Sequence, residues 1–284
     1  MIDTEAAMTV QEFQEQLRQT GAYESPAEAV GDRIGWLFGR GTAGYYLRAL
    51  GIVLAARRLV RQNRYTREAW AASSFDTVRT VETCGGAVSI AGLLPRGRHR
   101  GPVVYVANHM SMLETFLLPC VLLTYGDIAT VVKESLTQQR LFGPIMRSVR
   151  PICVGRQNPR DDLRAVLDQG AAALAQDRSI LIFPQATRTP SFDAQAFNSL
   201  GAKLARRAGA PMLAVALKTD FQGLGKVFRD YGRIDRRKRV YLRFGEPLTV
   251  SGNGREEHER VVAFIGHHLR AWGVPVINAP TAEP

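Results

Sequence analysis

Strand-like and helix-like segments alternate along most of the chain, and this alternation limits the possible folds more than any other feature. Short apolar runs predict strands at 87–94, 102–107, 127–132, 150–155, 179–183, 211–218 and 239–245. Helical patterns follow or separate these runs at 112–124, 158–176, 197–209 and 255–272, with a short helix expected between 132 and 150. The order favours an α/β fold, in which helices flank a mixed, largely parallel sheet.

Helix signals dominate the first part of the sequence. Thr9 and Glu12 have the spacing of a capping box. The serine and proline at 25–26 fit an N-cap followed by proline in the first helical position. A further helix is expected to begin at Thr66 and to end at the glycines 85–86. Residues before about 85 are therefore predicted to be helical.

Length and composition set the scale of the fold. The chain has 284 residues, of which 45% are hydrophobic, so it can bury a sizeable core. This size fits one large α/β domain with a small helical appendage. We therefore predict an N-terminal helical region at 1–85, an α/β domain at 86–275 and a C-terminal tail at 276–284.

The chain is strongly basic, with a formal net charge of +11. Such a balance indicates a polyanionic partner: a nucleic acid, an anionic membrane face, or an acidic carrier or substrate. The basic runs at 95–100 and 233–239 lack interleaved stacking aromatics, and no nucleic-acid-binding motif accompanies them. We therefore expect contacts with anionic lipid or an acidic carrier protein, and no nucleic-acid partner.

Cysteine and histidine spacing gives no metal or disulfide pattern. The three cysteines are far apart and odd in number, which favours a reducing compartment: Cys84, Cys120 and Cys153. Three histidines fall on the last predicted helix without the spacing of a zinc motif: His258, His267 and His268. No metal is expected.

One early stretch, residues 44–61, is apolar enough to suggest contact with lipid. It is interrupted by Arg48 and ends in three arginines, Arg57, Arg58 and Arg61. No apolar run of about 18 residues occurs, so a spanning helix is not expected. The acidic, polar N-terminus does not resemble a signal peptide. The pattern predicts a helix in a membrane interface, and the alternative is a core helix with a solvated basic end.

Asn108 and His109 follow the apolar run at 102–107, and Glu114 comes five residues after the histidine. In one interpretation, Ser111 is a helix N-cap and Glu114 completes a capping box by accepting the Ser111 N–H. In the other, Glu114 accepts the Nδ1–H of His109, and Nε2 can then remove a proton from a hydroxyl. The capping box alone does not explain the Asn-His pair.

Cations are expected just past three other strand ends. Lys133, Arg156 and Arg188 occupy these positions, and the strand before Lys133 is expected to neighbour the strand before His109. Sites in α/β sheets gather at the carboxyl ends of strands, and arginine binds phosphate through paired hydrogen bonds. Any one of these cations also fits a surface salt bridge. Together they predict an anion-binding site beside His109.

In order and spacing, four motifs resemble those of the glycerolipid acyltransferases, the group that includes 1-acylglycerol-3-phosphate acyltransferase. The family motif Asn-His-x4-Asp is similar to Asn108 through Glu114, and an apolar strand ending in Gly/Asp-Arg is similar to "ICVGR", which ends at Arg156. Phe-Pro-Glu-Gly-Thr-Arg is similar to "FPQATR" at 183–188, and a strand opened by proline is similar to "APMLAVAL". Lys133 matches the family's lysine between the first two motifs. The resemblance covers about 85–245.

The sequence departs from the family pattern in two places. Glu114 stands where the family has aspartate, which keeps a carboxylate one methylene longer and still able to orient His109. Gln185 and Ala186 stand where the family has Glu-Gly, which removes a charge and a conformationally free glycine. This second departure bears on the identity of the acceptor more than on the type of reaction.

The resemblance implies acyl transfer from a thioester, on coenzyme A or acyl carrier protein, to the hydroxyl of a lysophospholipid. 1-Acylglycerol-3-phosphate is the first acceptor to consider, and its product is phosphatidic acid. His109 would be the general base and Glu114 its orienting carboxylate. Substrate-binding roles fall on Asn108, Lys133, Arg156, Gln185, Thr187 and Arg188. Beyond the acyl-thioester co-substrate, no cofactor is required.

The resemblance also implies partners and a location. The partners are an anionic membrane surface, a lysophospholipid, and acyl-coenzyme A or acyl carrier protein; the location is the cytoplasmic side of the membrane, peripheral or monotopic. Two alternatives stay open: an acyltransferase for a different lysolipid, and a non-catalytic peripheral lipid-binding protein of the same fold. The second is supported by Gln185 and Ala186, and it is opposed by the retention of His109 with a carboxylate.

Overall fold

The computed structural model describes residues 8–26, 41–94, 101–185, 187–226 and 228–279. An eight-stranded sheet has the order β1-β2-β9-β8-β3-β6-β4-β5. Its strands are β1 (Tyr23–Glu24), β2 (Val88–Ala91), β3 (Val104–Ala107), β4 (Asp127–Lys133), β5 (Ile152–Val154), β6 (Arg178–Ile182), β8 (Met212–Lys218) and β9 (Val240–Leu248). The β1–β2 and β8–β9 pairs are antiparallel and the other pairs are parallel. The predicted mixed, largely parallel α/β sheet is confirmed.

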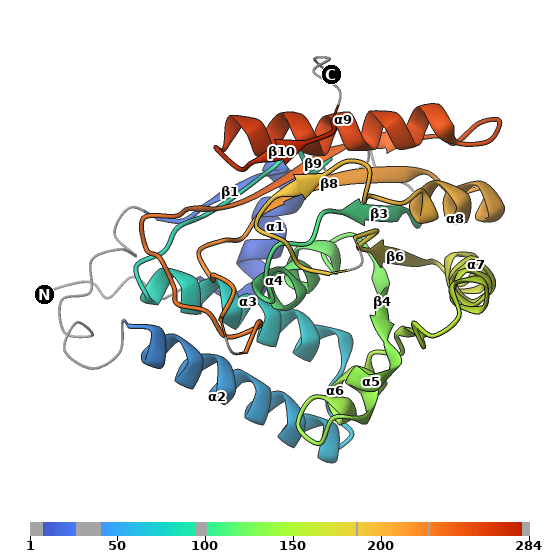
Figure 1. Cartoon of the computed structure of the whole chain (residues 1–284). Helices are drawn as coiled ribbons and strands as arrows, with labels where there is room; N and C mark the ends of the chain where they lie inside the picture. The colour runs from blue at the N-terminus through green and yellow to red at the C-terminus, as the bar shows by residue number, and fades with distance from the viewer. Residues whose placement is uncertain (1–7, 27–40, 95–100, 186, 227, 280–284) are drawn as a thin grey trace, which may run out of the picture.

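Helices cover both faces of this sheet (Figure 1). They are α1 (Val10–Thr20), α2 (Thr42–Arg61), α3 (Arg67–Thr83), α4 (Leu113–Leu122), α5 (Glu134–Gln138), α6 (Gly143–Ser148), α7 (Pro159–Ala175), α8 (Leu200–Ala208) and α9 (Arg255–Ala271). α1, α3 and α4 lie on one face, α8 and α9 on the other, and α2 packs outside α3 (Figure 1). The sheet is thus a middle layer between two helical layers.

Two hydrophobic clusters fill the space between these layers. Phe13, Phe75 and Leu117 bury α1, α3 and α4 against one face in a single cluster that also includes strand residues. A second cluster lies under α7, α8 and α9. Neighbouring residues of β3 point to opposite faces, so Tyr105 belongs to the first cluster and Val106 to the second. The N-terminal helices therefore share a core with the sheet.

The local helix signals are confirmed where the structure describes them. The Thr9 hydroxyl accepts the Glu12 N–H at 3.2 Å, and the Glu12 carboxylate accepts the Thr9 N–H at 2.7 Å. Thr66 caps α3. The helix predicted after residues 25–26, and the basic turn at 95–100, lie outside the described residues.

Three features differ from the sequence-based expectations. β1 is a strand inside the region expected to be helical, because two residues are too few to show a periodic pattern. A separate pair of short strands, β7 (Phe192–Asp193) and β10 (Val276–Ile277), joins the C-terminal segment to the chain after β6. β6 also lies between β3 and β4, so the strand that ends at Lys133 does not neighbour the strand that leads to His109.

The sheet order determines where a site can form. β3, β6, β4 and β5 are parallel to one another, so their carboxyl ends meet at one edge of the sheet. β8 is parallel to β3 and ends at the same edge. In sheets of this kind, this edge collects the polar residues that bind ligands.

Candidate functional site

Asn108 is the first residue after β3, and its side chain joins two strands. Its Nδ2 donates to the carbonyl of Leu217 at 2.8 Å, and its Oδ1 accepts the Leu217 N–H at 2.8 Å. The residue is buried. Both polar atoms of the amide thus bond the backbone of β8 and hold the end of β3 beside it. The sequence-based prediction had given Asn108 a substrate-binding role.

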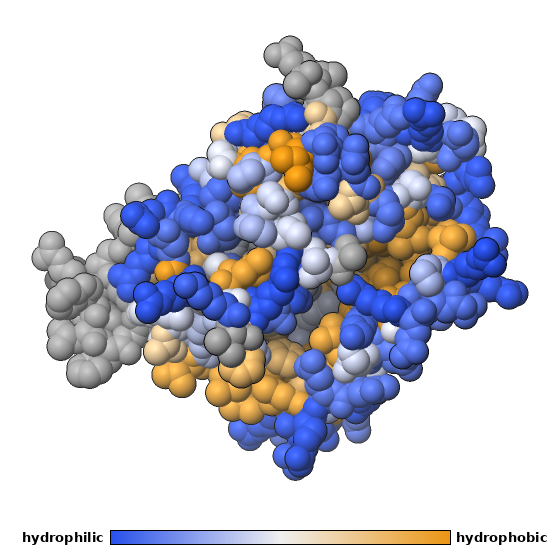
Figure 2. Space-filling model, in the orientation of Figure 1, coloured by the Kyte–Doolittle hydropathy of each residue, from blue (hydrophilic) through white to orange (hydrophobic). Residues whose placement is uncertain are grey.

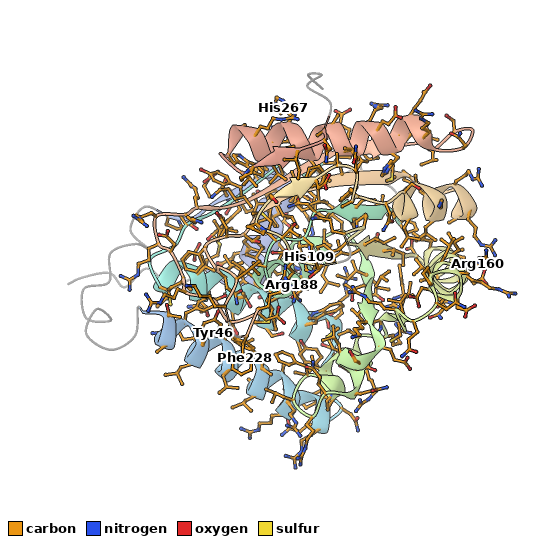
Figure 3. All side chains as sticks on the ribbon, viewed as in Figure 1. Tyr46, His109, Arg160, Arg188, Phe228 and His267 are labelled. Atoms are coloured by element: carbon orange, nitrogen blue, oxygen red, sulfur yellow. The ribbon has the colours of Figure 1, made fainter. Side chains whose placement is uncertain are left out.

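His109 follows directly, with its ring at the edge of the sheet (Figure 3). Nδ1 lies 2.8 Å from Oε1 of Glu114, and the ring stacks on Phe183 with 4.3 Å between centroids. The side chain is 13% exposed. With a carboxylate on Nδ1, the proton of the neutral ring belongs on that nitrogen, and the lone pair is on Nε2. This is the tautomer that a general base requires.

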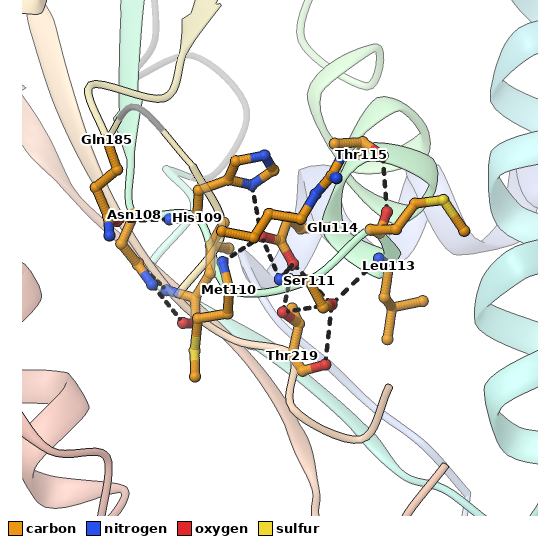
Figure 4. Close-up of polar contacts among 12 residues, drawn as sticks. Asn108, His109, Met110, Ser111, Leu113, Glu114, Thr115, Gln185 and Thr219 are labelled. Atoms are coloured by element: carbon orange, nitrogen blue, oxygen red, sulfur yellow. Dashed lines mark hydrogen bonds and ion pairs between the residues drawn. The ribbon is translucent and has the colours of Figure 1, made fainter. Parts of the chain in front are cut away.

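Glu114 is fully buried, and hydrogen-bond donors surround its carboxylate (Figure 4). Besides His109, it accepts the N–H of Met110 at 2.6 Å, the N–H of Ser111 at 3.0 Å and the Ser111 hydroxyl at 3.1 Å. The Thr219 hydroxyl donates to Oε2 as well. Every donor in this set favours the ionised form of the acid.

The pKa of Glu114 reflects these contacts. Burial works against its charge, but the hydrogen bond and charge of His109, with the Thr219 hydroxyl and the Met110 N–H, outweigh that effect. The pKa of Glu114 is therefore lowered from its ordinary value. An anionic Glu114 can hold the His109 ring in position and stabilise the imidazolium that forms when Nε2 takes a proton.

The structure contains the Glu114–His109 contact and one of the two hydrogen bonds of the expected capping box. The carboxylate accepts the Ser111 N–H, as a capping box requires, and the same carboxylate contacts His109. The helix begins one residue later than expected, however, because Met112 occupies the N-cap position of α4. The carboxylate thus fixes the entire turn between β3 and α4 as well as the ring.

Thr219 is a site residue that the sequence-based reasoning missed. It comes directly after β8, is fully buried, and contacts both Glu114 and Ser111; the Ser111 hydroxyl lies 2.9 Å from its Oγ1. Its position could have identified it: Thr219 directly follows a predicted strand, and polar residues that follow parallel strands lie at the same edge of the sheet. A threonine there is otherwise unremarkable.

Gln185 lies after β6 and connects that strand to the turn carrying His109. Its Oε1 accepts the His109 N–H at 2.8 Å, and its Nε2 donates to the Thr189 hydroxyl at 2.9 Å. The Thr189 N–H in turn donates to the His109 carbonyl at 3.0 Å. A neutral amide suits this position because it offers both an acceptor and a donor. The structure therefore shows Gln185 as a support for the His109 backbone.

Arg188 continues the same loop and is largely buried. Its guanidinium forms an ion pair with Asp230, and its carbonyl accepts a hydrogen bond from the Arg229 side chain at 2.6 Å. Its Nε is buried without a hydrogen-bond partner among the described residues. Thr187, one residue earlier, is exposed, and Ala186 lies outside the described residues.

Lys133 and Arg156 lie further along the same edge of the sheet. Lys133 ends β4 opposite Val154 of β5, and Arg156 follows β5 with a left-handed φ of 60°. The Asp162 carboxylate accepts the N–H groups of Gly155 and Arg156 at 2.9 Å each, which holds this turn. Both cations are exposed. The structure thus groups His109, Glu114 and Gln185 tightly and leaves Lys133 and Arg156 on the outer strands.

Comparison with known proteins identifies a family over the central part of the sheet. The Acyltransferase family profile matches residues 88–218, from β2 to the end of β8. Over this segment the chain matches the acyltransferase family. All of the site residues predicted from the sequence lie within that match, whereas Thr219 and Asp230 follow it.

Individual relatives share the family at low identity. A 1-acyl-sn-glycerol-3-phosphate acyltransferase of Pseudomonas aeruginosa is 27% identical over 171 residues, which cover 60% of this chain and 62% of that protein. An enzyme of the same description from Cocos nucifera is 27% identical over 86 residues, 30% of this chain and 27% of its own length. These relatives place the chain among the acyltransferases related to 1-acylglycerol-3-phosphate acyltransferase, without specifying its acceptor.

The fold is shared with a solved member of the family. The crystal structure of the 1-acyl-sn-glycerophosphate acyltransferase PlsC from Thermotoga maritima superposes with a TM-score of 0.59 at 17% sequence identity, covering 82% of this chain and 94% of that one. At this identity the likeness concerns the fold alone. Within the described part of this chain, no helix is long and apolar enough to cross a membrane, and no group of potential metal ligands gathers.

Proposed function

We propose that the protein transfers a fatty acyl group from acyl-coenzyme A or acyl carrier protein to the free hydroxyl of a lysophospholipid. The observation that carries this proposal is the 2.8 Å contact between His109 Nδ1 and a buried Glu114 whose pKa is lowered. Family membership and the motif order support the same reaction. 1-Acylglycerol-3-phosphate is the proposed acceptor, and phosphatidic acid the product.

The proposed chemistry uses His109 twice. Nε2 removes the proton of the acceptor hydroxyl as its oxygen attacks the thioester carbonyl, and Glu114 stabilises the resulting imidazolium. When the carbon–sulfur bond breaks, the imidazolium returns the proton to the departing thiolate. The new ester is then complete, the histidine is neutral again, and no acyl-enzyme forms. Arg188 is the proposed partner of the acceptor phosphate, and Lys133 and Arg156 are proposed to contact anionic parts of either substrate.

An acyl-transfer assay tests the reaction and the acceptor together. Purified protein receives labelled acyl-coenzyme A or acyl carrier protein, with lysophosphatidic acid in one tube and a mixed lysolipid extract in another. Labelled phosphatidic acid formed only by a protein with His109 supports the full proposal. A product formed only from the extract keeps the chemistry and changes the acceptor. No product that depends on His109 favours a non-catalytic lipid-binding role.

Replacing Arg188 with alanine is expected to raise the KM for a phosphate-bearing acceptor by about 10- to 100-fold with little change in kcat, since hydrogen bonds to charged groups contribute roughly 1.5–3 kcal/mol. Steady-state kinetics with acyl-coenzyme A and varied acceptor measure this. The matched control is Arg160→Ala, which removes an exposed arginine on α7 far from His109 (Figure 3).

The Arg188 ion pair calls for a second control. Arg188→Ala leaves Asp230 without its partner, so a local disturbance alone can weaken binding. The double variant Arg188→Ala/Asp230→Asn removes both charges. If it recovers the wild-type KM, the phosphate-binding assignment is wrong and the ion pair serves only the loop.

Helix α2 is the proposed site of membrane association, peripheral and on the cytoplasmic side. Leu47, Leu50 and Leu54 recur at helical spacing on its outer face and are exposed. Arg58 and Arg61 lie exposed at its C-terminal end, where they can contact anionic headgroups. Figure 2 shows hydrophobic side chains gathered over α2 at the lower edge of the molecule. Flotation of a Leu50→Ser/Leu54→Ser variant with anionic vesicles tests this, and unchanged binding would contradict it.

A further inference from the structure

Two exposed aromatic residues on the loop after β8 adjoin the apolar face of α2. Phe228 is 71% exposed and Tyr231 is 53% exposed. In the described residues, the other large exposed hydrophobic side chains are Leu47, Leu50 and Leu54 of α2, and Ile277. Single exposed apolar residues are ordinary, but an apolar surface to which two elements contribute marks an interaction site. We call residues 222–226 and 228–232 the aromatic loop.

The aromatic loop is fixed to α2 by specific contacts. The Tyr46 hydroxyl donates to the Gly232 carbonyl at 2.7 Å, and the Tyr46 and Tyr231 rings lie 5.5 Å apart. Gln222 donates both to the Tyr46 hydroxyl, at 3.2 Å, and to the Asp230 carbonyl, at 3.0 Å. Figure 3 shows Phe228 and Tyr46 beside each other at α2. The aromatic loop and the leucine face of α2 therefore belong to one surface.

The backbone of the aromatic loop is closely packed on itself. A Cβ at Gly225 would lie 2.1 Å from the Phe228 carbonyl oxygen, and one at Gly232 would lie 2.0 Å from the Gly223 carbonyl oxygen. Only glycine permits the chain to approach itself so closely. These close approaches therefore require glycine at both positions.

The charges beside these aromatic residues are mainly basic. Lys226, Arg229 and Arg233 are exposed on and next to the aromatic loop, and Asp230 is paired with Arg188. Arginines also lie exposed at the end of α2. Aromatic residues within a basic surrounding match an anionic bilayer, where the rings reach the headgroup level and the cations meet phosphate.

The aromatic loop also contacts the candidate site. Asp230 pairs with the Arg188 guanidinium, and Arg229 donates to the Arg188 carbonyl. Arg188 lies three residues after Gln185, which holds the His109 N–H. A lipid surface against Phe228 would therefore lie beside the segment that connects to His109.

We propose that the aromatic loop is a second lipid-contacting element, which together with α2 brings the segment around Arg188 to an anionic bilayer. Phe228 and Tyr231 enter the interface, and the basic residues beside them contact the headgroups. One part of this proposal rests on the proposed function, namely that the contact serves to receive a lipid-borne acceptor near Arg188. The binding of the bilayer itself does not.

Flotation of the full chain with vesicles tests the contact. The vesicles contain phosphatidylcholine with phosphatidylglycerol, and the variants are Phe228→Ser and Phe228→Ser/Tyr231→Ser. Each should lower the partition coefficient by about tenfold or more, because burying one large apolar side chain accounts for at least that factor. Ile277→Ser is the matched control, since Ile277 is 50% exposed and belongs to β10. Flotation equal to wild type in both loop variants, or an equal loss in Ile277→Ser, would overturn the proposal.

Activity with two forms of acceptor separates this inference from the proposed function. With a short-chain acceptor dissolved as monomers, Phe228→Ser should turn over like wild type, because no lipid surface is involved. With a long-chain acceptor in vesicles, its rate should fall in parallel with flotation. If wild type acylates neither form, the proposed function fails, while flotation still decides the role of the aromatic loop. A fall that is equal with both acceptors would show that the loop acts on the site and not on the lipid surface.

Discussion

Alanine at position 109 is expected to lower the rate of acyl transfer by about 10²- to 10⁴-fold, because positioned general bases typically contribute that much. The substitution removes the imidazole whose Nε2 is proposed to take the proton of the acceptor hydroxyl. Glu114 keeps its other donors, from Met110, Ser111 and Thr219, so the buried carboxylate stays hydrogen-bonded. The fold should therefore survive the change.

Kinetics and thermal unfolding together make this prediction decisive. kcat should fall while the melting temperature changes little. His267→Ala is a matched control, because this histidine lies on α9, at the far side of the sheet from His109 in Figure 3. Near-wild-type turnover in His109→Ala would remove the base assignment. A large fall in melting temperature would instead mean that the lost activity reflects misfolding.

Much of the fold could be predicted because its signals are local. Strands such as β6 and β8 are continuous apolar runs in the sequence, and helices such as α3 begin at a recognisable N-cap. The fold class and the positions of these elements can therefore be predicted from residues that are close together in the chain. Strand order is a different kind of information. The residues of β4 do not indicate that β6 lies between β4 and β3 in the sheet. The strand β1 has only two residues, which are too few to show a periodic pattern.

The same distinction applies to the site. His109 and Glu114 are five residues apart, so their contact could be predicted from one turn. Thr219 is 105 residues from Glu114, and Asp230 is 42 residues from Arg188, and only the folded sheet brings these partners together. Gln185 and Asn108 were identified by their motifs, but their backbone contacts depend on the placement of β6 and β8. Sequence thus locates His109 and Glu114, but not the residues from other strands that hold them in place.

Glutamine at position 114 is expected to lower the rate by about 10²- to 10⁴-fold, since a neutral amide cannot stabilise the imidazolium formed during proton transfer. The amide also meets an unsuitable environment. Its NH₂ group would face N–H and O–H donors that now bond both carboxylate oxygens. Unpairing a buried charge-assisted network costs roughly 3 kcal/mol or more, so the melting temperature should fall as well.

Measurements at acid pH should show whether Glu114→Gln destabilises the fold through the lost negative charge or through the changed side-chain group. Because the pKa of Glu114 is lowered in the folded protein, its charge contributes stability that is present above the ordinary value of the acid, about 4.3, and is lost as pH falls through the folded value. The gap in melting temperature between wild type and Glu114→Gln should thus be widest near neutral pH and should narrow as the pH falls below that ordinary value. A gap that is constant with pH would show that ionised Glu114 does not stabilise the fold.

Glu114→Asp supplies the conservative comparison, because it keeps the charge and shortens the side chain by one methylene. Its stability should retain the wild-type response to pH. Its activity should be intermediate, since a shorter carboxylate at this position cannot keep every contact that Glu114 makes at once with His109, Met110 and Thr219. Thr219→Val removes one of these donors and leaves the carboxylate in place, so its loss of rate should be smaller than that of Glu114→Gln. An equal loss in Thr219→Val would mean that the hydroxyl, and not the charge, is what positions the base.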